Sequence, residues 1–269
     1  MSNELNRLDQ ALCVYDLCAG YGKQDIVSHV SFSLPKGEVV GILGPNGCGK
    51  TTLLKALCGL LPCKGSIELE GQDLRKLSVK ARARLTGYIP QRSGLSIDLS
   101  LLDVVLMGFN PQLSLLQYPT EDMKKRALEA LDMVGLIERA GDNYQELSEG
   151  QKQLCMLART MVTPRPLLLL DEPESALDFG GRYQMLHRLS EYVKEQNGLA
   201  LVTLHDPQLA LHSCDRLLLM REGKLLGQLI PAKDPVEEMA EKLTALFGPL
   251  SLHRLADGSG QDHLVLLHR

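Results

Sequence analysis

The sequence lacks the features that would place it in a membrane, secreted or nucleic-acid-binding class. No apolar stretch approaches the length needed to cross a bilayer, and residues 1–10 are polar, without the apolar core of a signal peptide. We therefore expect the chain to stay in the cytoplasm. Neither sign of charge dominates, because the formal net charge is only −4. The net charge thus gives no reason to expect nucleic acid as a partner, although it does not exclude a local patch of basic residues.

Paired cysteine patterns are also missing. The seven cysteines are scattered, odd in number and contain no C-x-x-C pair. We expect reduced thiols that pack as small apolar side chains. Cys13 with Cys18 and Cys58 with Cys63 share one spacing, but no histidine lies nearby at ligand spacing, so a metal site is the weaker alternative.

What remains is an ordinary globular composition. The chain has 269 residues, 44% of them hydrophobic and 23% charged. This length is enough for a substantial core, in one large domain or two small ones.

The most informative stretch is VVGILGPNGCGKTT, which begins at Val39. Its apolar start, bounded by glycines, predicts a short buried strand, and the run from Thr52 predicts a helix. Between them lies the G-x-x-x-x-G-K-[ST] spacing, in which backbone N–H groups and a helix N-terminus surround phosphate. Lys50 can neutralise phosphate charge, and Thr51 can ligate Mg²⁺. A simple glycine-rich turn is the alternative. The predicted phosphate-binding residues are Gly44, Pro45, Asn46, Gly47, Cys48, Gly49, Lys50, Thr51 and Thr52.

Two further apolar runs deliver polar side chains to a sheet edge. Residues 167–170 are four leucines followed by Asp171 and Glu172, and residues 199–204 precede His205. Runs of this kind predict buried parallel strands, whose carboxyl ends bind ligands. We expect Asp171 to bind Mg²⁺ and Glu172 to polarise a water for attack on the γ-phosphate, although adjacent acids can also merely start a turn. His205 can bond a γ-phosphate oxygen or the Glu172 carboxylate.

Three other positions have both a functional and a structural interpretation. Gln91 ends a predicted strand and either holds a water or metal or is an ordinary polar loop residue. Tyr21, in a glycine-flanked turn, either stacks on a nucleotide base or lies on the surface. Ser148 with Gln151 fits a capping box, so it starts a helix and can also form an anion site.

The rest of the chain gives the organisation. We expect strands and turns over residues 11–34, an edge strand with one wet face over 65–71, and a solvated basic helical face over 75–84. Residues 93–146 are helical, with one helix capped by Thr120 and stopped by Gly135. The tail predicts a hairpin over 217–230, a helix over 236–247 and a second hairpin over 250–267, without chemistry of its own; it can cover a sheet edge.

Taken together, GPNGCGKT, Gln91, LSEGQ, LLLLDEP, SALD and His205, in this order, resemble the nucleotide-binding subunit of an ABC transporter over nearly the whole chain. The resemblance implies an α/β fold with a P-loop NTPase core of mostly parallel sheet and flanking helices, an antiparallel β subdomain and an inserted helical subdomain. The core then comprises residues 11–92 and 160–230, the helical subdomain 93–159, and a C-terminal helix and hairpin 231–269, all in one ATP-binding domain.

By the same resemblance, each motif has a role. The implied assignments are base stacking by Tyr21, Walker A at residues 44–51, the Q-loop at Gln91, the signature with Ser148, Gly150 and Gln151, the Walker B pair Asp171 and Glu172, the D-loop ending at Asp178, and the switch histidine His205. Catalysis falls to Lys50, Gln91, Glu172 and His205, and Mg²⁺ binding to Thr51, Gln91 and Asp171.

The resemblance also implies partners. Two copies form a head-to-tail dimer in which each ATP lies between Walker A of one copy and the signature of the other. The dimer docks, through a groove beside Gln91 and the helical block, on integral membrane permease subunits at the cytoplasmic face of the membrane, with an extracytoplasmic substrate-binding protein as an indirect partner. The stretch VVLMGFNP, the early ESALD and the tail hairpin resemble importers of iron-siderophore, haem or cobalamin type.

Two positions depart from the family pattern. Glu149 stands where glycine is usual, and Glu174 where threonine is usual. A carboxylate beside the nucleotide repels phosphate unless it points away or pairs with a cation, so we expect Glu149 to weaken ATP-driven closure.

The alternative function is a soluble ABC ATPase of an assembly or repair complex. The chain has no long coiled-coil insertion between its Walker motifs and carries one motif set, which argues against chromosome or DNA-repair ATPases and tandem translation factors. Co-purification with an integral membrane protein distinguishes the two functions.

Overall fold

A six-stranded sheet forms the centre of the computed structural model, which describes residues 10–22, 24–92, 94–114, 116–256, 258 and 262–268. The strand order is β10-β9-β3-β8-β7-β6, and all strands are parallel except β10. Their bounds are β3 Val39–Leu43, β6 Thr86–Ile89, β7 Leu167–Asp171, β8 Leu199–Leu204, β9 Arg216–Arg221 and β10 Lys224–Leu229. Every residue of β3, β7 and β8 is buried, as expected for strands covered on both faces.

A second, antiparallel sheet has the order β2-β1-β4-β5. Its strands are β1 Gln10–Tyr21, β2 Gln24–Pro35, β4 Cys63–Leu69 and β5 Gln72–Asp73. The predicted edge strand over residues 65–71 is wrong in its position, because β4 lies between β1 and the two-residue β5. Glu70 and Gly71, both with positive φ, make the tight turn that returns the chain as β5.

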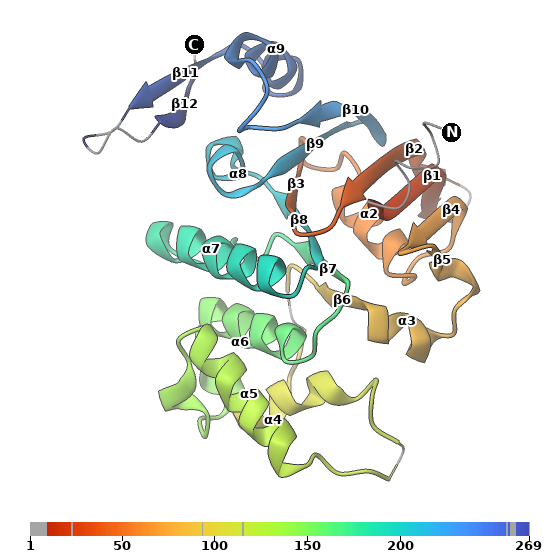
Figure 1. Ribbon diagram of the computed structural model, residues 1–269, viewed down its shortest axis with the longest axis vertical. Helices are drawn as coiled ribbons and strands as arrows, with labels where there is room; N and C mark the ends of the chain where they lie inside the picture. The colour runs from red at the N-terminus through yellow and green to blue at the C-terminus, as the bar shows by residue number, and fades with distance from the viewer. Residues whose placement is uncertain are drawn as a thin grey trace.

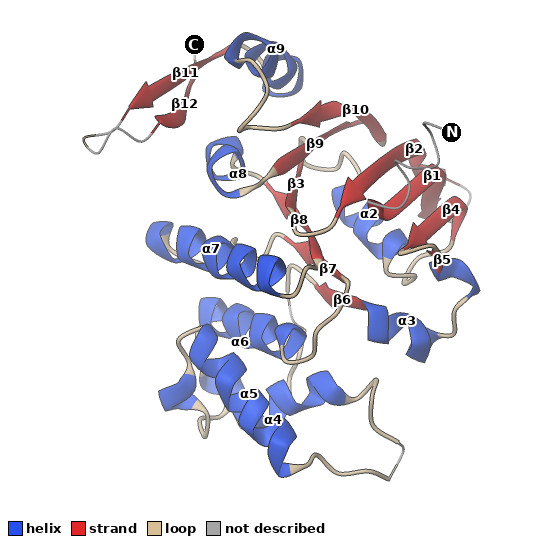
Figure 2. Cartoon of the chain, in the orientation of Figure 1, coloured by secondary structure: helices blue, strands red, loops and turns tan. Residues whose placement is uncertain are grey.

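Helices cover both faces of the central sheet and form a separate block (Figures 1 and 2). Their bounds are α2 Lys50–Leu57, α3 Val79–Leu85, α4 Leu101–Leu106, α5 Glu121–Met133, α6 Glu149–Met161, α7 Phe179–Glu195, α8 Pro207–Ser213 and α9 Val236–Phe247. Figure 1 shows α4, α5 and α6 together at one end of the molecule, on the far side of α7 from the C-terminal hairpin. As predicted, the Thr120 side chain caps α5 by accepting from Met123 N at 3.3 Å.

Two apolar cores lie on opposite faces of the sheet. Val40 and Ile42 of β3 pack with α2 and the antiparallel sheet, whereas Val39 and Leu43 pack with the helical block, α7 and α8. The alternation along β3 is the ordinary period of two, with both faces apolar. The phosphate loop therefore follows a strand that is fixed from both sides.

Arg165 connects the helical block to the core. This buried guanidinium donates to Gly108 O at 2.9 Å and to Ala83 O at 3.2 Å, and it also bonds Thr160 O. Helix α6 ends at Met161, and its buried apolar residues belong to the core on one face of the central sheet. The helical block therefore shares this core with the central sheet.

The longest helix, α7, was not among the predicted elements. Asp178 caps it by accepting from Gly181 N at 2.8 Å, and its buried residues recur at helical spacing. The buried set is Met185, Leu186, Leu189, Tyr192 and Val193. Both signals are present in the sequence.

The tail ends in the hairpin β11 Leu250–Ala256 and β12 Asp262–His268. It does more than cover a sheet edge: the Gln208 amide of α8 donates to Leu264 O at 2.6 Å and accepts from Leu266 N at 2.8 Å. Lys242 of α9 donates to Gln228 O on the edge strand β10 at 3.1 Å.

All seven cysteine thiols are free, and four of them, Cys18, Cys48, Cys155 and Cys214, are buried. Within the described ranges, no cluster of three or more His, Cys, Asp and Glu side chains could hold a metal. In the same part of the chain, no helix combines the length and the apolar character that a membrane crossing requires.

Candidate functional site

A cavity of about 440 Å³ opens where β3, β7 and β8 end. The chain contributes to it from five separate segments, which only the sheet topology brings together. Its lining residues are Tyr21, Ile26, Asn46, Gly47, Cys48, Gly49, Lys50, Thr51, Thr52, Gln91, Glu172 and His205. Most of the predicted phosphate loop, together with the predicted Tyr21, Gln91, Glu172 and His205, therefore faces one space.

The phosphate loop joins β3 to α2 in a conformation that requires glycine. Gly47 and Gly49 have φ values of 76° and 108°, and a Cβ on Gly49 would lie 3.2 Å from a methyl of Val27. Gly49 is also the N-cap of α2, without a side-chain cap bond. The N-terminus of α2 thus presents backbone N–H groups and the positive end of the helix dipole to the cavity.

Lys50 is held by the loop itself. Its ammonium donates to Gly44 O at 2.7 Å and Pro45 O at 3.4 Å, and only 5% of the residue is exposed. Gly44 and Pro45 are therefore supports of the cavity and not part of its lining. A buried cation with two neutral acceptors and, within the described part of the chain, no carboxylate partner is poised to bind an anion.

Asp171 is bonded by two hydroxyl groups. Thr51 Oγ1 donates to Asp171 Oδ1 at 3.0 Å and Thr203 Oγ1 donates to the same atom at 2.8 Å. Thr203 also accepts from Glu172 N at 2.8 Å, so one hydroxyl orients both acids. A hydroxyl and a carboxylate at this separation are oxygen ligands of the kind Mg²⁺ prefers.

Glu172 contacts two of the other predicted catalytic side chains, Gln91 and His205. Gln91 Nε2 donates to Glu172 Oε2 at 2.5 Å, and His205 Nε2 contacts Glu172 Oε1. Glu172 is buried and has φ of 49°, an unusual conformation for a non-glycine residue. The strained turn directs the carboxylate to the cavity beside Lys50.

The signature residues lie elsewhere in this chain. Ser148 Oγ accepts from Gln151 N at 3.3 Å, and Gln151 Oε1 accepts from Ser148 N at 3.0 Å, which is the predicted capping box. Gly150 packs on the D-loop, since a Cβ there would lie 2.9 Å from Ala176 O. Ser148, Gly150, Gln151 and Asp178 do not line the phosphate cavity.

The two departures from the family pattern differ in their surroundings. Glu149 is exposed and its carboxylate pairs with Lys152 at 2.9 Å, so the expected repulsion is partly compensated. Glu174 is buried, and burial together with the nearby Glu172 raises its pKa to about 7.

Thr203 supports the two acidic residues of the site, although no sequence motif includes it. The sequence does carry a signal for this residue, because its hydroxyl lies within the otherwise apolar, fully buried strand β8 (LALVTL), two residues before His205. Ile26 of β2 also lines the cavity and carries no recognisable signal.

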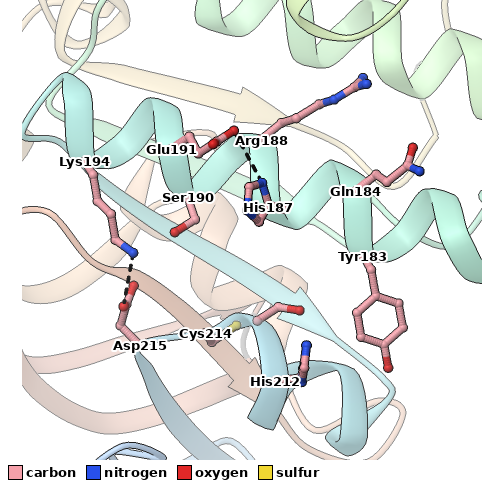
Figure 3. Close-up of a pocket in the computed structure, with 11 residues that line it drawn as sticks. Tyr183, Gln184, His187, Arg188, Ser190, Glu191, Lys194, His212, Cys214 and Asp215 are labelled. Atoms are coloured by element: carbon pink, nitrogen blue, oxygen red, sulfur yellow. Dashed lines mark ion pairs between the residues drawn. The ribbon is translucent and has the colours of Figure 1, made fainter. Parts of the chain in front are cut away.

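A larger cavity, of about 550 Å³, lies between α7 and α8 and contains none of the motif residues. Figure 3 shows two ion pairs among the residues that line it, and their distances are 3.3 Å for His187 with Glu191 and 3.9 Å for Lys194 with Asp215. The predicted phosphate-binding and catalytic side chains gather instead at the cavity at the sheet edge.

The family model described as ABC transporter matches residues 27–175, more than half of the chain. The chain belongs to the ABC transporter family. It is an ATPase of that family, in which ATP hydrolysis is coupled to transport.

Curated relatives and solved structures of ABC transporter proteins match along most of the chain. A probable iron chelatin transport ATP-binding protein of Helicobacter pylori is 35% identical over 87% of this chain and 91% of its own. A hemin import ATP-binding protein of Vibrio cholerae is 32% identical over 90% and 94%. An inward-facing ABC transporter of metal-chelate type superposes with a TM-score of 0.80 at 30% identity, over 97% of this chain and 98% of that one.

A further relative in the family is a bacterial ABC transporter cassette solved as a dimer. It superposes with a TM-score of 0.75 at 25% identity, over 83% of this chain and 100% of that chain. The α/β fold with an antiparallel β subdomain and a helical block is thereby confirmed.

Proposed function

We propose that this ABC transporter ATPase powers an importer whose cargo is an iron-siderophore complex, haem or a cobalamin-like compound. The observation that carries its chemistry is the convergence of Lys50, Glu172 and His205 on one cavity. The cargo is supported by the names of two relatives, which transport iron chelatin and hemin, and by the metal-chelate type of the similar solved transporter.

In the proposed reaction, the phosphate loop binds the triphosphate and Glu172 accepts a proton from the attacking water. Lys50 exchanges its carbonyl partners for phosphate oxygens, which develop charge during transfer. Gln91 and His205 fix the Glu172 carboxylate, one on each oxygen. Bound Mg²⁺, held by Thr51, Asp171 and Gln91, would neutralise phosphate charge.

The test of this assignment is Glu172→Gln. The variant keeps the size of the side chain and its contact to Gln91 but loses the proton acceptor, so kcat for ATP hydrolysis should fall by on the order of 10²–10⁴ with ATP still bound. Phosphate release and binding of a fluorescent nucleotide measure the two effects. A variant that turns over normally would remove Glu172 from this role.

We further propose that two copies act head to tail, with Ser148 of one facing the ATP on the other. One chain carries one motif set, and its capped α6 start lies outside its own phosphate cavity, so a second copy is needed to bring the two together. Nonhydrolysable ATP should then drive dimerisation, and a dimer that leaves Ser148 remote from every terminal phosphate would contradict the arrangement.

The docking site that we propose for the membrane subunit is a cavity of about 390 Å³ between β6 and the helical block. Its apolar walls include Pro90, Leu95 and Met156, and Gln91 follows directly along the chain. A helix of an integral membrane permease would fill it, with the extracytoplasmic binding protein on the other side of the bilayer. Co-purification with an integral membrane protein supports this function, and consistent recovery with only soluble partners favours an assembly or repair ATPase.

A further inference from the structure

Glu174 is a buried carboxyl group that the proposed reaction does not use. Only 4% of the residue is exposed, and its Oε2 has no hydrogen-bond partner among the described residues. The charged form of a buried, poorly solvated carboxyl is costly, so the neutral acid is favoured.

Charged and titratable groups from separate segments of the chain surround Glu174. Glu172 lies in the same turn, Arg182 on α7, and Cys214 at the end of α8. Burial is the main reason that the pKa of Glu174 rises to about 7, and Glu172 adds to it; the backbone N–H of His205 and the Arg182 charge act in the opposite direction. Arg182 is engaged elsewhere, since its Nε donates to Leu177 O at 3.0 Å.

This cluster places Glu174 behind the Glu172–His205 pair. The backbone of His205 faces Glu174, while its imidazole contacts the Glu172 carboxylate in the cavity. A charge on Glu174 therefore acts on both members of the pair without touching the nucleotide.

We propose that Glu174 is a positioning residue whose change of charge behind Glu172 and His205 makes the ATP cavity of this protein pH-sensitive near neutrality. The inference rests on the proposed roles of Glu172 and His205. When Glu174 is neutral, it adds no charge to the carboxylates of Asp171 and Glu172 beside the triphosphate. When Glu174 ionises, it adds a further negative charge near the triphosphate, which repels ATP.

The expected consequence is a KM effect. As the pH rises through about 7, the KM for ATP of the wild-type protein should increase by about three- to tenfold, the size expected for one screened charge at this depth. A group that only packed the turn would not produce a transition in KM.

The experiment compares full-length wild type with Glu174→Gln and Glu174→Thr in steady-state phosphate release between pH 6 and 8.5. Both variants keep this position neutral, so the part of the KM increase that Glu174 causes should be absent from both. Glu195→Gln, an exposed charge loss at the end of α7, is the matched control and should retain it. The readout is the ratio of wild-type KM to variant KM at each pH, because any titration of ATP itself is common to every variant. A ratio of wild-type KM to variant KM that stays constant across this pH range for both variants overturns the proposal.

A second measurement does not depend on activity. Because the pKa of Glu174 is raised by folding, its contribution to stability is complete below the ordinary pKa of 4.5 and is lost as the pH rises to about 7. The urea midpoint of wild type should thus fall relative to Glu174→Gln between these pH values and then stay constant. An unchanged difference across this range, or a ¹³C-carboxyl titration without a group near pH 7, overturns the inference.

The two proposals fail in different ways. Normal turnover by Glu172→Gln contradicts the proposed reaction, whereas an inactive Glu172→Gln with unchanged pH profiles in both Glu174 variants contradicts the positioning role alone.

Discussion

The two helix starts that face phosphate in the proposed dimer are built in opposite ways. α2 begins after Gly49, in a left-handed conformation and without a side-chain cap, whereas α6 begins at Ser148 with a complete capping box. The first start is open and has a buried cation beside it; the second is closed by its own side chain. One chain therefore contains a preorganised phosphate site and a helix start whose hydroxyl can still donate to a ligand while accepting from Gln151 N.

This difference indicates distinct energetic roles. The α2 loop can bind ATP within a single chain, because its glycines and Lys50 already surround the cavity. The α6 start offers one exposed hydroxyl and the end of a dipole, so its contribution should appear only when two copies meet. The following predictions test that division, from the largest effect to the smallest.

Removal of the Lys50 ammonium should disable phosphate binding at the N-terminus of α2. In Lys50→Ala the triphosphate loses the buried ammonium, so kcat/KM for ATP hydrolysis should fall by on the order of 10²–10³. Lys55→Ala removes the same charge from the last turn of α2, outside the cavity, and should leave hydrolysis nearly unchanged. Equal losses in both variants would show that the effect is helix stability and not phosphate binding.

Modification of Cys48 should block ATP binding at the N-terminus of α2, because this cysteine is part of the phosphate loop. Cys48 lines the cavity but is 5% exposed, and burial raises the pKa of its thiol above the ordinary value of 9.0, against the effect of Lys50. Alkylation should accordingly be slow at neutral pH, accelerate up to and beyond pH 9, and abolish ATP binding in modified molecules. MgATP should protect the thiol, and Cys48→Ala should be indifferent to the reagent. Full ATP binding after complete alkylation would contradict the placement of the nucleotide.

Removal of the Ser148 hydroxyl at the N-terminus of α6 should affect hydrolysis only in the dimer. Ser148→Ala loses a capping bond, at about 1 kcal/mol, and a hydroxyl that can bond a charged phosphate. Hydrolysis should fall by about 10–100-fold with ATP affinity of the single chain unchanged. Ser100→Ala is the matched control, because Ser100 caps α4 by accepting from Asp103 N at 3.1 Å. If both variants lose hydrolysis equally, Ser148 is a cap and nothing more.

Changes at Glu149 should have the smallest effect. Glu149→Gly should tighten ATP-dependent dimerisation by at most about fivefold, because the side chain is exposed and already paired with Lys152. Lys152→Ala, which leaves the carboxylate unpaired, should loosen it. Analytical ultracentrifugation with nonhydrolysable ATP measures both, and unchanged or looser dimerisation of Glu149→Gly rejects the expectation.

Prediction from sequence succeeded where local patterns are strong. The spacing over residues 236–247 gave α9 with its observed bounds, and the runs at β3 and β8 gave those strands. Prediction failed where the position of a strand depends on its neighbour in the sheet. The alternation in β4 predicts an edge strand, but β5 pairs with it and, with two residues, is too short to show a pattern in the sequence. α7 was overlooked although its cap and its periodic face were present.

The sequence by itself determined the family, the order of the motifs and the phosphate loop, because glycine spacing, apolar periodicity and caps are local properties of the chain. The tertiary structure decided which side chains meet. It placed Gln91 and His205 on the two oxygens of Glu172, gave Thr203 its bond to Asp171, and buried Glu174 behind them. Burial and pairing depend on segments far apart along the chain, so only the folded sheet could fix them.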